Sequence, residues 1–131
     1  MAHLVIVDDD ADLRELLGTI LQAHGHAVRE AQNGQEGLEL VADQTPDLLL
    51  VDVEMPVLDG PGMAYGLLFR DCGDENIPIV LLSGMVGLPQ LAHALGTPYF
   101  LAKPYSLDAL VRLVNRALHE RVPPRPRLEA S

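Results

Sequence analysis

The chain of 131 residues has only one cysteine and one lysine, and it has no tryptophan. Cys72 has no partner for an internal disulfide, and nothing in the sequence indicates a cysteine-based metal site. No apolar run reaches the ~18 to 20 residues that a membrane-spanning helix needs. The first residues, MAHLVIVDDD, contain neither a basic leader nor a long apolar stretch before a cleavage site, so we expect no signal peptide and a cytoplasmic location.

Positive charge is scarce as well. The chain has 9 Lys and Arg residues against 19 Asp and Glu residues, which gives a net charge of −10. Most of the excess negative charge lies in residues 1–60, where Arg14 and Arg29 are the only Lys or Arg residues. Phosphates of nucleic acids require Lys and Arg, so we expect no nucleic-acid contact by this segment. The single lysine, Lys103, is therefore conspicuous.

Short apolar runs alternate with helical patterns along the chain. Hydrophobic residues make up 48% of the sequence, which is enough for one compact domain with a buried core. Three of the runs are continuous, which is typical of strands buried on both faces, whereas the second is shorter and more polar, as in an edge strand. We predict strands at residues 4–7, 26–28, 47–51, 77–82 and 99–102.

Apolar residues recur at helical spacing between these runs. The first predicted helix is capped by Asp10 and ends at Gly25, the second is capped by Asn33, and the fifth is capped by Ser106. The third spans residues 61–70, and the fourth is a short helix over residues 89–95 between Gly87 and Gly96. Their inward faces are predicted to contain Leu13, Leu16, Leu17, Ile20, Leu21, Leu38, Val41, Met63, Leu67, Leu68, Leu107, Leu110, Val114, Ala117 and Leu118.

This alternation predicts an α/β domain with a parallel sheet covered by helices on both faces. We expect the domain to span residues 1–120, followed by a Pro- and Arg-rich tail or disordered linker over residues 121–131. Ligands of such sheets bind at the carboxyl ends of the strands, near the point where the strand order reverses.

Polar residues follow four of the predicted strands at this edge. They are Asp8, Asp9 and Asp10 after the first strand, Asp52 and Glu54 after the third, Ser83 after the fourth, and Lys103 with Pro104 after the fifth. Clustered carboxylates raise one another's pKa unless a cation joins them. An oxygen-rich cluster without His or Cys suits Mg²⁺.

A carboxylate beside Mg²⁺ can attack a phosphoryl group and form an aspartyl phosphate. Lys103 and the hydroxyl of Ser83 can hold the charged oxygens of the incoming group. Each residue also has an ordinary structural interpretation: Asp10 as a helix cap, Asp52 as a turn former, Ser83 as a loop residue and Lys103 as a solvated side chain. Their conjunction at one predicted edge favours phosphoryl chemistry.

These residues also match a known family. Over about residues 2–120 the chain resembles the receiver domain of two-component response regulators. The matching stretches are LVIVDDD, NGQEGLEL, PDLLLVDVEMPVLDG, the SG after IVLL, and LAKPYSLDAL. The resemblance implies a flavodoxin-like (βα)5 fold, with five helices around five parallel strands in the order 2-1-3-4-5.

The resemblance also implies roles for the acidic residues. Asp52 looks like the phosphoacceptor. Asp8 and Asp9, together with Asp52 and the backbone carbonyl of Glu54, look like the ligands of Mg²⁺, for which Mn²⁺ can substitute.

The same resemblance assigns the remaining strand-end residues. Ser83 and Lys103 would bind the phosphoryl group, Phe100 would be the switch aromatic, and the peptide bond before Pro104 would be cis. The donor would be a phosphohistidine on a sensor histidine kinase or a phosphotransfer protein. An output partner would bind the face made by the fourth helix, fifth strand and fifth helix. Such a protein catalyses only its own phosphorylation and dephosphorylation.

Three other functions compete with this one. A receiver fold can serve as a phosphorylation-independent protein-binding module. A phosphatase of the haloacid dehalogenase type also uses a strand-end aspartate with Mg²⁺, but places it in a DxDxT pattern on the first strand, whereas Asp52 follows the third. A flavodoxin-like FMN carrier needs a phosphate-binding loop after the first strand, where DDDAD would repel the phosphate.

Overall fold

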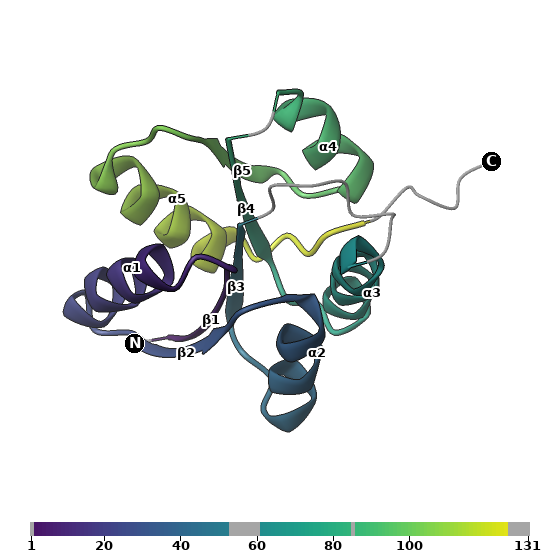
Figure 1. Ribbon diagram of the computed structural model, residues 1–131, viewed down its shortest axis with the longest axis horizontal. Helices are drawn as coiled ribbons and strands as arrows, with labels where there is room; N and C mark the ends of the chain where they lie inside the picture. The colour runs from purple at the N-terminus through teal and green to yellow at the C-terminus, as the bar shows by residue number, and fades with distance from the viewer. Residues whose placement is uncertain (1, 53–60, 85, 126–131) are drawn as a thin grey trace.

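The computed structural model describes residues 2–52, 61–84 and 86–125, and within them the side chains of residues 61–66 are not described. Strands and helices alternate along the described chain (Figure 1). The elements are β1 (His3–Val7), α1 (Ala11–Ala23), β2 (Ala27–Ala31), α2 (Gly34–Asp43), β3 (Leu48–Asp52), α3 (Pro61–Asp74), β4 (Ile79–Ser83), α4 (Leu88–Leu95), β5 (Tyr99–Ala102) and α5 (Leu107–Glu120). Among the helices of this described part, none is long and apolar enough to cross a membrane.

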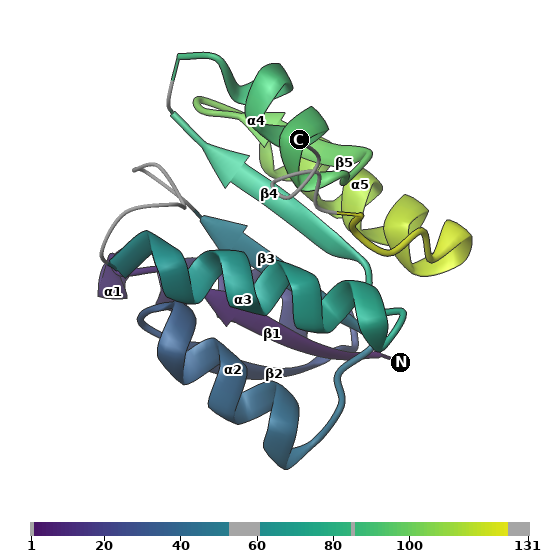
Figure 2. The same ribbon diagram turned by 90° about the vertical axis from the view of Figure 1, so that its right-hand side faces the viewer.

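The five strands form one parallel sheet in the order β2-β1-β3-β4-β5. This confirms the predicted fold class and strand order, and it confirms that the second strand lies at an edge. Figure 2 shows the arrowheads of β1, β3 and β4 at the same side of the molecule. The carboxyl ends of these strands therefore meet at one edge of the sheet.

Helices cover both faces of this sheet. In Figure 1, α1 and α5 lie on one side and α2 and α3 on the other. Leu4 and Ile6 of β1 pack in the cluster on the α1 and α5 side, and Val5 and Val7 pack in the cluster on the opposite side. All four are at most 1% exposed. Burial on both faces explains the continuous apolar run, and each such side chain stabilises the fold by about 1.5–3 kcal/mol.

The predicted helix caps are present. The side chain of Asp10 accepts hydrogen bonds from the N–H groups of Asp12 and Leu13, at 3.0 and 3.2 Å. Asn33 caps α2 through the N–H of Glu36 at 2.8 Å. The remaining cap is Ser106, whose hydroxyl accepts from the N–H of Ala109 at 3.0 Å. These bonds satisfy donors that the first helical turn leaves without a partner.

Three leucines that we predicted on inward helix faces are exposed instead. Leu16, Leu67 and Leu107 have 50%, 49% and 46% of their surface accessible. On α1, Leu17 and Leu21 already occupy the line that faces the sheet, and Leu16 lies on its flank. A periodic pattern identifies an apolar stripe, but it does not give the width of the surface that covers the stripe.

The chain continues past α5 along the molecule. The N–H of Val122 donates to the Tyr99 hydroxyl at 3.2 Å, and the N–H of Arg125 donates to the Gly96 carbonyl at 3.1 Å. Pro124 is buried. Residues 121–125 therefore run from α5 toward α4 and α3 (Figure 1). Residues 126–131 of the expected disordered tail lie outside the described residues, and the domain boundary at residue 120 stays a prediction.

Gly96 provides a test of this C-terminal segment. It ends α4 in the left-handed region at φ +70°, and a Cβ there would overlap the carbonyl group of Arg125. Gly25, after α1, has φ +91° but open space around it. We expect Gly25→Ala to lower the free energy of unfolding by about 1 kcal/mol through backbone strain alone, and Gly96→Ala to lower it further by displacing the segment.

Urea unfolding of both variants measures this difference. The same pair should be compared in a chain truncated after residue 120, where the extra effect at Gly96 should vanish. Equal effects of the two substitutions in the full chain would contradict a tight contact between Gly96 and Arg125.

Candidate functional site

The pairing of β1 with β3 brings two of the predicted acids together. Val7 is the register partner of Val51, so Asp8 and Asp52, the next residues, lie opposite each other at the carboxyl edge. Asp8 is 2% exposed and Asp52 is 4% exposed. Asp9, next along the chain, is exposed. Two carboxylates are thus buried side by side, an arrangement that needs a compensating positive charge.

Lys103 provides positive charge in the described structure. Its Nζ lies 2.5 Å from Oδ2 of Asp52, whose side chain is 1% exposed. The lysine is held in place by its backbone N–H, which donates to the carbonyl of Ser83 at 3.0 Å, and the peptide bond to Pro104 is cis, as the resemblance implied. The ends of β3, β4 and β5 therefore meet at Asp52.

The environment of Asp8 disfavours its charged form. Burial raises the pKa of its carboxyl group, and the negative charge of Asp9 adds to this increase. Three interactions oppose this increase in pKa. They are a hydrogen bond from the N–H of Asp10 to Oδ1 at 2.9 Å, a hydrogen bond with Asp52 and the positive charge of Lys103. Asp8 and Asp52 are therefore close enough for each carboxyl group to influence the charge of the other.

The donor set fits a divalent cation. Oδ2 of Asp8 is buried, and in the described part of the chain no hydrogen-bond donor reaches it. Residues 2–52, 61–84 and 86–125 contain no group of three His, Cys, Asp or Glu side chains arranged for a metal. Mg²⁺ commonly takes only one or two carboxylates and keeps several waters, so Asp8 and Asp52 suffice. Glu54, whose carbonyl was the expected further ligand, lies outside the described residues.

The two predicted switch residues lie on β4 and β5. Ser83 ends β4, is fully buried and pairs in register with Ala102, next to Lys103. Phe100 is 37% exposed and borders a surface hollow of about 400 Å³ beside α5. Ser83 therefore lies at the edge that carries Asp52, whereas Phe100 lies three residues before Lys103, with part of its ring at the surface.

An apolar groove opens beside Lys103. It has a volume of about 330 Å³ and is lined by Leu13, Leu16, Leu17, Lys103, Pro104, Tyr105 and Leu107. The two exposed leucines of α1 and α5 that the sequence placed in the core, Leu16 and Leu107, thus form part of a surface that adjoins the acidic site.

Sequence reasoning missed two residues of this region. Arg14 donates from Nη1 to the carbonyl of Asp8 at 2.6 Å and forms an ion pair with Glu30 at 3.1 Å, which holds the turn between β1 and α1. The hydroxyl of Tyr105 is buried near the site. No spacing rule identifies Arg14. Tyr105 directly follows the Lys-Pro pair, which was the one available signal.

Comparison with known proteins identifies the family of this chain. Residues 4–115 match the response regulator receiver domain family. The chain belongs to this family. The receiver domain is 37% identical over 124 residues to the response regulator MprA of Mycolicibacterium vanbaalenii, and 33% identical over 124 residues to the probable transcriptional regulator ycf27 of Cyanidium caldarium. These alignments cover 93% and 91% of this chain but 52% and 48% of the relatives. The chain thus spans about half the length of the curated relatives it matches.

Solved structures give the same fold. The receiver domain of NtrX from Brucella abortus superposes with a TM-score of 0.73 at 29% identity, covering 88% of this chain and 98% of that one. A CheY-like receiver domain protein from Methanospirillum hungatei gives a TM-score of 0.77 at 23% identity, covering 92% and 96%. The chain is therefore a response regulator receiver domain with the flavodoxin-like fold.

Proposed function

We propose that this receiver domain is a phosphorylation-activated switch that accepts a phosphoryl group on Asp52 from a phosphohistidine of a sensor histidine kinase or phosphotransfer protein. The observation that carries the proposal is the placement of Asp52, which is buried, opposite Asp8 and 2.5 Å from the ammonium group of Lys103. A buried carboxylate with a second acid and a cation at its side has the composition that phosphoryl transfer requires.

In the reaction, a carboxylate oxygen of Asp52 forms a bond to phosphorus while the bond from phosphorus to the histidine nitrogen breaks. The imidazole leaves and takes up a proton. Bound Mg²⁺, held by Asp8, Asp9 and Asp52, would neutralise charge on the phosphoryl oxygens. Lys103 moves its ion pair from the Asp52 carboxylate to a phosphoryl oxygen, and the hydroxyl of Ser83 donates to another.

The return reaction ends the signal. Water attacks phosphorus, the bond between phosphorus and the Asp52 oxygen breaks, and inorganic phosphate leaves. The carboxylate is regenerated. The protein therefore reacts only at its own side chain, turns over no external substrate as an end in itself, and acts as a switch rather than as an enzyme.

The output follows from a change at β4 and β5. When Ser83 donates toward the phosphoryl group, the loop after β4 moves toward the site. Phe100, which is now partly exposed, turns inward and remodels the face of α4, β5 and α5. The downstream partner binds this face. Cytoplasmic action and the absence of nucleic-acid contact remain expectations from composition.

The phosphodonor protein binds at the apolar groove beside Lys103. Leu16 and Leu107 are half exposed there, and Lys103 belongs both to the groove and to the ion pair with Asp52. A protein seated on these leucines would present its phosphohistidine next to the acceptor.

Beryllofluoride with Mg²⁺ tests the switch, because beryllofluoride bound to a carboxylate resembles a phosphoryl group. We expect the amide NMR signals of Asp52, Ser83 and Phe100 to shift when both are added to the wild-type protein. Asp52→Asn, which lacks the carboxylate, should show no such shift. Unchanged wild-type spectra would favour the alternative, a receiver fold used as a phosphorylation-independent binding module.

A further inference from the structure

Tyr105 lies in an unusual environment beside the phosphorylation site. It follows the cis peptide at Pro104, and its ring packs against the hydrophobic cluster that α1 and α5 form with the sheet. The ring also lines the groove next to Leu13 and Leu17 of α1. Its hydroxyl is buried and has no hydrogen-bond partner within residues 2–52, 61–84 and 86–125.

A buried hydroxyl without a partner destabilises a protein, because the group loses its hydrogen bonds to water and gains none in return. Buried tyrosines usually find a partner for this reason. Tyr99 of the same chain does so: its hydroxyl donates to Glu120 at 3.0 Å and accepts from the N–H of Val122 at 3.2 Å. Phenylalanine would fill the position of Tyr105 without the destabilising hydroxyl.

The hydroxyl of Tyr105 lies within the electric field of the acidic site. Burial raises the pKa of Tyr105, the negative charges of Asp52 and Asp8 raise it further, and the positive charge of Lys103 opposes them. The geometry agrees with this. Leu4 and Ile6, at alternate positions before Asp8, belong to the same cluster as Tyr105, so the alternation along β1 directs Asp8 to that face.

Asp8 offers the complementary atom. Its Oδ2 is a buried acceptor that no donor of the described residues reaches, and the hydroxyl of Tyr105 is a buried donor in the same condition. A carboxylate oxygen has two lone pairs, so Oδ2 can accept a hydrogen bond and bind a cation at the same time. Carboxylates that bind metals are commonly oriented by such outer hydrogen bonds.

We propose that Tyr105 is a positioning residue of the phosphorylation site, whose hydroxyl donates through one water to the Asp8 carboxylate and orients it toward Mg²⁺. This inference rests on the proposed function, because it assigns Asp8 as a ligand. The hydroxyl acts only through Asp8 and does not touch the phosphoryl group. Removing it weakens Mg²⁺ binding and slows phosphorylation at low Mg²⁺, and it leaves the metal-free fold intact.

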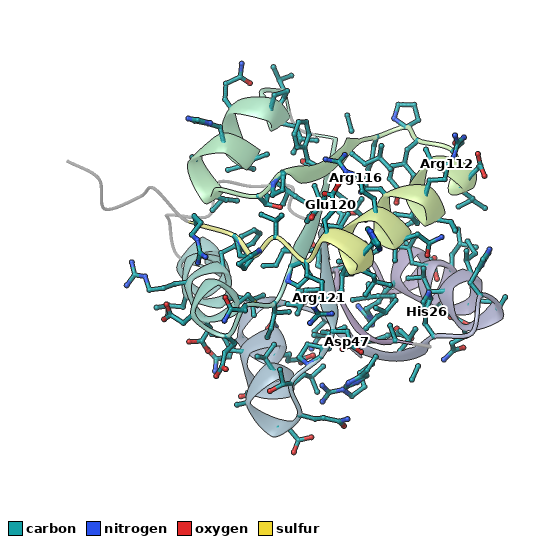
Figure 3. All side chains as sticks on the ribbon, turned by 180° about the vertical axis from the view of Figure 1, so that it is seen from behind. His26, Asp47, Arg112, Arg116, Glu120 and Arg121 are labelled. Atoms are coloured by element: carbon teal, nitrogen blue, oxygen red, sulfur yellow. The ribbon has the colours of Figure 1, made fainter. Side chains whose placement is uncertain are left out.

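The test compares Tyr105→Phe with Tyr99→Phe, which removes a hydroxyl that is already bonded and belongs to the structure rather than to the site. The dissociation constant of Mg²⁺ is measured for each protein from the shift of backbone amide signals. The urea midpoint is measured without Mg²⁺. Figure 3 shows Glu120, the acceptor of the Tyr99 hydroxyl, beside Arg116 on α5.

We expect Tyr105→Phe to raise the dissociation constant of Mg²⁺ about tenfold, the lower end of the range for outer hydrogen bonds to metal ligands, with an unchanged or higher urea midpoint. Tyr99→Phe should give the reverse: a lower midpoint and an unchanged Mg²⁺ affinity. Mg²⁺ affinity of Tyr105→Phe within twofold of the wild type, or a midpoint as low as that of Tyr99→Phe, would overturn the proposal.

Wild-type protein in the same experiment separates this inference from the proposed function. A wild-type protein that neither binds Mg²⁺ nor takes up label from a small phosphodonor would contradict the proposed function itself. A wild-type protein that does both, next to a Tyr105→Phe variant that behaves identically, would refute the role of Tyr105 alone.

Discussion

Asp52→Asn will leave the receiver domain folded but unable to take up a phosphoryl group. An amide is a poor nucleophile toward phosphorus, and Asp52 is the carboxylate that Lys103 contacts at 2.5 Å. The substitution weakens the ion pair with Lys103, but it also removes the repulsion between Asp52 and Asp8. Because these two effects oppose each other, we expect only a small change in the free energy of unfolding. The measurement is intact-protein mass after incubation with a small phosphodonor and Mg²⁺, where only the wild type should gain one phosphoryl group.

Asp47→Asn is the matched control. Asp47 precedes the same strand at the opposite edge of the sheet, where it accepts a hydrogen bond from the N–H of His3 at 2.8 Å and lies 3.9 Å from Arg121. Figure 3 shows Asp47 and Arg121 on this side of the molecule. An asparagine retains an acceptor for His3, and the variant should be phosphorylated at the wild-type rate. Equal uptake by Asp52→Asn and the wild type would rule out Asp52 as the acceptor.

Asp8→Asn will make the metal-free protein more stable and insensitive to Mg²⁺. The variant removes one of two buried negative charges, whose repulsion is on the order of 3 kcal/mol at ~5 Å and an effective dielectric of ~20. Lys103 already offsets part of this repulsion, so we expect the free energy of unfolding to rise by about 1–3 kcal/mol. The wild type should regain stability when Mg²⁺ binds to the folded state, and Asp8→Asn should not.

Urea unfolding with and without millimolar Mg²⁺ measures both effects. Asp10→Asn is the control from the same run of acids: Asp10 is exposed, and asparagine is an equally good helix cap. Its stability and its response to Mg²⁺ should both match the wild type. A response to Mg²⁺ in Asp8→Asn equal to that of the wild type would contradict the assignment of Asp8 as a ligand.

The strands and their polar ends could be predicted because they depend on local sequence. A run such as Leu48 to Val51 is buried on both faces wherever it sits in a parallel sheet, and the residue after it must emerge at the carboxyl edge. The same argument places Asp8 and Lys103 at that edge. Helix caps are local as well, and the bonds made by Asp10 and Asn33 agree with the prediction.

Exposure of individual helix residues could not be predicted in the same way. Leu16 and Leu107 have the spacing of core residues, but both reach the surface, because spacing does not give the width of the surface that covers a helix. The contacts of residues 121–125 could not be predicted either, because the burial of Pro124 and the hydrogen bond from Arg125 to Gly96 depend on segments that are distant in the sequence.

The sequence by itself determined the fold class, the strand order through family resemblance, and the acids that could react. Only the tertiary structure decided that Asp8 and Asp52 are both buried, that Lys103 compensates their charge, and that the Tyr105 hydroxyl is buried beside them. The reason is physical. Hydrophobic periodicity depends only on residues that are close together in the sequence, whereas the energy of a charge or a buried hydroxyl depends on partners that other strands contribute.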